Sequence, residues 1–175
     1  MALKIKNQGA SPETDVAATF KELSKTATSL NLATDRLNSA VQQVNEALKE
    51  LNLGVSSWTT FDVDEDGPFL SKEQIGYDKL NGRWSILLRS IFEDRGAPSD
   101  QPEDVSTWFF TEAPRHMRLK GIGHLHKLLA QLNEDAENTA RNIIMKSVEA
   151  EQFAKAIYRL ADEESEKKMP PTEDK

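Results

Sequence analysis

Apolar residues recur in alternating steps of four and three from Val16 to Leu51, a spacing typical of a coiled-coil or bundle helix. Ser11-Pro12 supplies a capping hydroxyl and a first-turn proline, and Gly54 is a favourable C-terminal cap. The pattern predicts a flexible leader over residues 1–10 and a coiled-coil helix over residues 11–53. The predicted oligomerisation seam of this helix consists of Phe20, Leu23, Leu30, Leu37, Val41, Val44, Leu48 and Leu51.

The residues beside this seam are small or uncharged, whereas two-stranded coiled coils usually carry Glu and Lys there. Asparagine recurs every seventh position on one side, and alanine recurs on the other. The buried stripe is therefore wide, which indicates more than one neighbouring helix. We interpret the asparagines as solvated residues beside the seam. The alternative is an asparagine ladder that fixes the register or the oligomeric state of the helices.

A second run with the same spacing extends from Ile122 to Leu160 and follows Pro114, which suits the first turn of a helix. Thr139 and Lys146 interrupt this stripe near its centre. The run predicts a long C-terminal helix over residues 113–161. A disordered tail is expected over residues 162–175, because they are rich in charge and contain two adjacent prolines.

The region between the helices, residues 54–112, favours strands. Residues 55–61 are β-branched and aromatic, and residues 74–80 and 83–91 flank Asn81-Gly82, a strong type I′ hairpin signal. Residues 105–111 resemble a further strand. The expected fold class is mainly α with a small β insertion, in which two long antiparallel helices flank a small antiparallel meander with acidic loops.

Composition narrows the function classes. The 175 residues carry a net charge of -7, which disfavours general binding to nucleic acids or anionic membranes. The absence of cysteine excludes disulfides, thiolate catalysis and Cys-ligated zinc. No apolar run approaches the ~18 residues that span a bilayer, and residues 1–9 lack the core of a signal peptide. These observations predict a cytoplasmic protein with no membrane association.

Residues 62–73 match the spacing of an EF-hand calcium loop. The flanking segments contain glycines and β-branched residues rather than two helices, so a solvated acidic loop is the favoured interpretation and a calcium-responsive protein is one alternative. No cofactor is therefore expected, and calcium is the alternative. Its candidate ligands are Asp62, Asp64, Asp66 and Glu73.

Residues 115–127 hold all three histidines and several basic side chains without an acidic residue. Cations at a helix N-terminus oppose the helix dipole, so they need a negatively charged partner. The nearest acids in the sequence, Asp94, Asp104 and Glu112 among them, are the favoured partners. Binding of a nucleic-acid backbone, in a nucleic-acid-associated protein, or of an acidic protein is the alternative for this segment.

No nucleophile elbow or glycine-rich phosphate loop is present, and an enzyme is not expected. The leading hypothesis is an oligomeric helical scaffold or adaptor that binds itself and a protein partner, through the β region or exposed helix faces. The predicted partner-binding residues are Arg115, His116, Arg118, Lys120, Trp58, Trp84, Trp108 and Phe109.

Overall fold

The computed structural model describes residues 12–96 and 104–167. The chain divides after Leu51 into an N-terminal unit and a second unit that begins at Asn52 and contains the remaining elements. Each unit is described by itself. The leader predicted for residues 1–10 lies outside the described residues, as does the part of the predicted tail from residue 168 onward.

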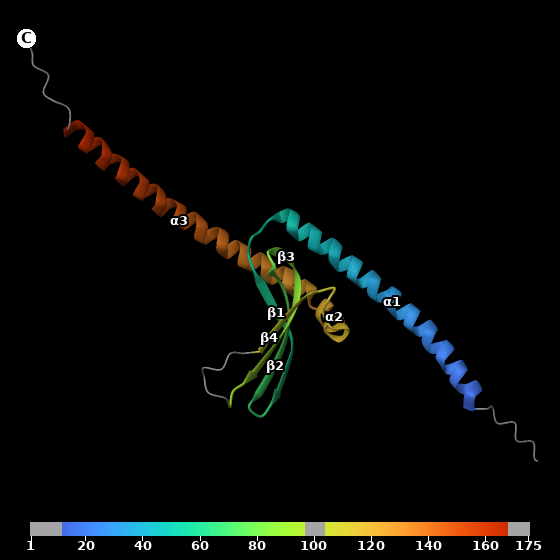
Figure 1. The fold of residues 1–175 in the computed structure, drawn as a ribbon. Coiled ribbons are helices and arrows are strands. Elements are labelled where there is room, and N and C mark those ends of the chain that lie inside the picture. Colours follow the sequence, from blue (N-terminus) through green and yellow to red (C-terminus); the bar gives the residue numbers. More distant parts are fainter. Residues whose placement is uncertain (1–11, 97–103, 168–175) are drawn as a thin grey trace, which may run out of the picture. The chain divides into compact units, whose positions relative to one another are not determined.

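The described part of the N-terminal unit is one helix, α1, which spans Pro12–Leu51 (Figure 1). Its interior has no glycine or proline, so nothing interrupts the backbone hydrogen bonds over 40 residues. The helix ends where Asn52 adopts a left-handed conformation, with φ of 48°. This is the conformation of a helix C-cap, and it comes two residues before the glycine expected to supply it.

The second unit begins with an antiparallel meander of four described strands in the order β1-β2-β3-β4 (Figure 1). Asn81 and Gly82 join β2 to β3 with φ angles of 51° and 80°, which confirms the predicted hairpin. A β-bulge between Thr60 and Asp62 shifts the register of the first strand pair. The strands are β1 Ser57–Asp66, β2 Phe69–Leu80, β3 Arg83–Asp94 and β4 Asp104–Phe109.

Two helices follow the sheet: α2, Arg115–Ile122, and α3, Leu125–Lys167. Helix α2 contacts β1, β2 and β3, and α3 contacts β1 and β2. Gly121 allows the close approach, because a Cβ atom there would lie 2.9 Å from Leu88 and 3.3 Å from Phe61. The core of this unit includes Ile75, Tyr77, Ile86, Leu88, Phe110, Met117, Leu128 and Leu132.

The predicted fold class is wrong: the protein is α+β rather than mainly α. The prediction treated residues 62–73 as an acidic loop, but β1 continues through Asp66 and β2 starts at Phe69. Asp and Glu disfavour strands in general, yet β1 is an edge strand, where charged residues are common. The single C-terminal helix that was expected is instead divided between α2 and α3. Helix α3 also continues to Lys167, into the predicted tail.

Among the described residues, no helix is both long enough and apolar enough to cross a membrane.

Candidate functional site

The four candidate calcium ligands lie on one β-hairpin. Asp62, Asp64 and Asp66 alternate along β1 and therefore share one face of the strand. Glu73 lies directly opposite Asp62 on β2, and the turn between the strands places Gly67 at a φ of 57°. The acidic residues thus form a row along a sheet surface.

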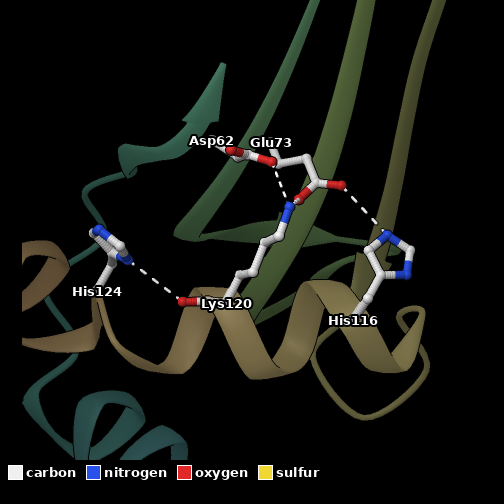
Figure 2. A network of polar contacts seen from close by, with 5 residues as sticks. All are labelled: Asp62, Glu73, His116, Lys120 and His124. Atoms are coloured by element: carbon white, nitrogen blue, oxygen red, sulfur yellow. Dashed lines mark hydrogen bonds and ion pairs between the residues drawn. The ribbon is translucent and has the colours of Figure 1, made fainter. Parts of the chain in front are cut away.

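Helix α2 brings basic side chains to this row (Figure 2). The ammonium nitrogen of Lys120 donates a hydrogen bond to Asp62 Oδ2 at 2.5 Å and lies 3.9 Å from Glu73 Oε2. The imidazole Nε2 of His116 lies 3.4 Å from Glu73 Oε1. His124, beyond the end of α2, places Nδ1 3.4 Å from the carbonyl oxygen of Lys120.

Electrostatics favour this arrangement. The hydrogen bond to Asp62 raises the pKa of Lys120, and the negative charges of Glu73 and Asp64 act in the same direction. Glu73 is the most enclosed member, because only 16% of its side chain is exposed. In the part of the chain that the structure describes, no group of three or more His, Asp or Glu side chains is arranged to hold a metal ion. The contacts of Lys120 with Asp62 and Glu73 are ion pairs within the chain.

The structure thus joins two segments that the sequence analysis treated as separate candidates. Lys120 and Asp62 are 58 residues apart, and no local signal links them. The partners of Lys120 are Asp62 and Glu73, which lie farther along the chain than the acids expected to pair with this segment. Arg115 is exposed at the start of α2, and Arg118 is half-buried.

The other face of the sheet carries Trp58. Residues that pair directly in an antiparallel sheet point to the same side, which places Gly76 next to Trp58 and opposite to the acidic row. The indole nitrogen of Trp58 donates a hydrogen bond to Asp78 Oδ2 at 3.0 Å. The guanidinium carbon of Arg89 lies 3.8 Å from the centroid of the indole ring, a cation–π contact.

Further hydrogen bonds extend this cluster. Arg89 Nε donates to Gln74 Oε1 at 2.5 Å, and Gln74 Nε2 donates to the Thr60 hydroxyl at 2.8 Å. Burial raises the pKa of Asp78, but hydrogen bonds from the Ser56 hydroxyl, its neighbour's backbone amide and the indole outweigh this and lower the pKa. The cluster orients Trp58 flat against β2.

The predicted aromatic partner-binding residues do not form a single surface. Strand pairing places Trp58 and Phe109 on one face of the sheet, and Trp84 and Trp108 on the face that α2 contacts. Trp84 stacks on Tyr77, with ring centroids 5.5 Å apart. The aromatic residues therefore contribute to both faces, a division that alternation along the strands predicts once the register is known.

Many of the exposed large apolar side chains lie on the long helices. Residues 15–33 of α1 are all exposed, and the predicted seam within them leaves 70% of Phe20 and 60% of Leu23 accessible. Residues 140–161 of α3 are all exposed as well. The exposed large apolar side chains of that segment are Ile143, Ile144, Met145, Val148, Phe153, Ile157, Tyr158 and Leu160.

The rest of the predicted α1 seam continues the same helix face toward its C-terminus, with Leu37, Val41, Val44, Leu48 and Leu51. Val41 and Leu48 are buried, Leu37 and Val44 are half-buried, and Leu51 is exposed. Most of the accessible part of the stripe therefore lies in residues 15–33.

Comparisons of the chain with protein-family models, curated proteins and solved structures find no match. The features that bear on function are accordingly the ion-paired hairpin, the Trp58 cluster and the exposed helix stripes.

Proposed function

We propose that the protein is a non-enzymatic scaffold. It self-associates through the exposed apolar stripes of α1 and α3 and presents its four-stranded sheet to a protein partner. The observation that carries the proposal is the exposure of regularly spaced apolar residues on residues 15–33 of α1 and 140–161 of α3. Large apolar patches of this kind mark interaction sites in folded proteins. Assembly would also bring several copies of the sheet together, and this multivalency would strengthen binding to a partner that has several binding sites.

Helix stability supports the same proposal. Protein helices are stabilised mainly by packing of an apolar face rather than by helix propensity. The exposed part of α1 contains Thr19, Thr26 and Thr28, whose β-branched side chains lower helix propensity. A packing partner for the stripe would stabilise this stretch of the helix.

The apolar area that association would bury is large enough to offset much of the cost of association. Covering the accessible parts of Val16, Phe20, Leu23 and Leu30 contributes on the order of 5 kcal/mol per copy. Association costs about 4–15 kcal/mol in lost freedom. Two copies joined through α1 alone therefore lie near balance, and the stripe of α3 would shift the equilibrium toward assembly.

The ion pairs of Lys120 favour this proposal over the two alternatives. A nucleic-acid backbone would have to compete with Asp62 and Glu73 for the same ammonium group. A calcium ion would have to displace that ammonium group from the same two carboxylates. Both alternatives therefore involve breaking contacts that the chain makes within itself.

The test is the mass of the full chain in solution, measured by light scattering after size exclusion, for two matched double variants. Phe20→Asn with Leu23→Asn removes two stripe residues, and the mass should fall toward 19.6 kDa. Leu32→Asn with Ala18→Asn changes exposed positions on the opposite side of α1, and the mass should stay unchanged. Equal masses for wild type and both variants would remove α1 from the proposed interface.

A further inference from the structure

The sides of the exposed α1 stripe lack charge. One side of the seam carries Ala17, Ser24 and Asn31, and the other side carries Thr19, Thr26 and Ala33. In a two-stranded coiled coil these positions border the interface and usually carry Glu and Lys, whose ion pairs select the partner. Here all six are small, uncharged and exposed, so each could be covered by a neighbouring helix without burying a charge.

From this we infer that residues 15–33 of α1 assemble with at least two further copies of the same segment, so that the assembly is a bundle of three or more helices. The inference rests on the proposed self-association and specifies its order. A pair of helices would cover the seam and leave both uncharged sides in water. A third helix covers them, which adds buried area to an association that is near balance for two copies.

A second copy of this chain suits the surface because of its charge. Residues 15–33 contain two acids and two bases, so the segment has no net charge although the whole chain carries -7. Copies of this segment can therefore approach without net repulsion. The four charged side chains of the segment lie away from the seam and its sides: Asp15, Lys21, Glu22 and Lys25.

The exposed part of α3 provides an independent reason to expect more than two helices. Ile143 belongs to its heptad stripe, whereas Ile144, Met145 and Val148 lie on other sides of the same turns. These side chains widen the apolar face of the segment, and Asn142, Lys146 and Glu149 leave the remaining side polar. A wide apolar face of this kind is typically covered by more than one neighbour, because a single partner helix would leave part of it in water.

Sedimentation equilibrium on the full chain distinguishes the inference from the proposed function. A mass of three or more times 19.6 kDa supports both. A mass of twice 19.6 kDa keeps the proposed self-association but overturns the higher-order bundle. A mass of 19.6 kDa at every concentration overturns both.

Charge variants then locate the contact on α1. Ser24→Glu with Thr26→Glu places a carboxylate on each side of the seam, and association should weaken at least tenfold. The control, Thr28→Glu with Ser29→Glu, adds the same charges to exposed positions farther from the seam and should leave the mass unchanged.

A third variant, Ser24→Ala with Thr26→Ala, keeps both sides small and should retain the wild-type mass. Circular dichroism at equal concentration establishes that each variant remains helical. Unchanged association of Ser24→Glu with Thr26→Glu, or equal weakening by the Thr28 and Ser29 control, would overturn the assignment of these sides to the interface.

Discussion

Replacing Gly76 with alanine tests the packing of Trp58 on the sheet. The new Cβ atom would lie 2.3 Å from two ring carbons of Trp58 and 2.8 Å from the carbonyl oxygen of Ser57. Normal contact between carbon atoms requires about 3.5 Å, so the ring has to move by more than 1 Å. That movement separates the indole from both Asp78 and Arg89.

The cost follows from the contacts that this movement breaks. The indole hydrogen bond to Asp78, a charged acceptor, contributes about 1.5–3 kcal/mol. The cation–π contact with Arg89 contributes about 0.5–1 kcal/mol at an exposed site. Alanine recovers about 0.5–1 kcal/mol, because glycine is unfavourable within a strand. We therefore expect Gly76→Ala to lower the free energy of unfolding by about 2 kcal/mol, measured by urea denaturation.

A double-mutant cycle separates this effect from a general intolerance of β2. In a Trp58→Ala background the clash with the ring is gone and only the close approach to the Ser57 carbonyl oxygen remains, so adding Gly76→Ala should cost less than it does in the wild type. The coupling between the two positions should then exceed about 1 kcal/mol. Equal costs of Gly76→Ala in both backgrounds would refute the view that glycine is required there to accommodate the indole.

Four other outcomes are expected. Gly121→Ala should cost about 1–3 kcal/mol by overpacking α2 against the sheet, whereas Gly123→Ala, whose Cβ meets only an ordinary contact at 3.5 Å, should change unfolding by less than about 0.5 kcal/mol. Gly82→Ala should cost about 1–2 kcal/mol because φ is 80°. The pKa of Asp78 is lowered in the folded protein, so the stabilisation that its carboxylate contributes is present above pH 3.8 and is lost as the pH falls through the folded-state pKa. Asp78→Asn should remove this part of the acid dependence of the unfolding free energy, measured by urea titrations at several pH values. The pKa of Lys120 is raised in the folded protein, so the stabilisation that its ammonium group contributes is present below pH 10.5 and is lost as the pH rises through the folded-state pKa. Lys120→Met should remove this part of the alkaline dependence of the unfolding free energy.

Local signals in the sequence predict the elements with strong periodicity or turn chemistry. The heptad spacing before Leu51 corresponds to α1, and Asn81-Gly82 identifies the hairpin because type I′ turns require positive φ at both positions. The sequence does not predict the full extent of the sheet, because the acidic pattern of residues 62–73 indicates a loop. The strand conformation of residues 62–66 depends on pairing with β2, which is a tertiary effect.

The candidate sites illustrate the same limit. An EF-hand pattern identifies residue types and spacing, but a hairpin presents Asp62, Asp64 and Asp66 in a row instead of around an ion. The ion pair between Lys120 and Asp62 depends on how α2 packs on the sheet. That packing requires Gly121, whose role becomes apparent only when Leu88 and Phe61 are seen beside it.

The central claim, that exposed helix stripes join copies of the chain, is tested most directly by the absolute mass of the full chain across a concentration series, measured by light scattering. The account predicts a mass of three or more times 19.6 kDa at high concentration, decreasing on dilution. A constant mass of 19.6 kDa up to millimolar concentration would contradict it.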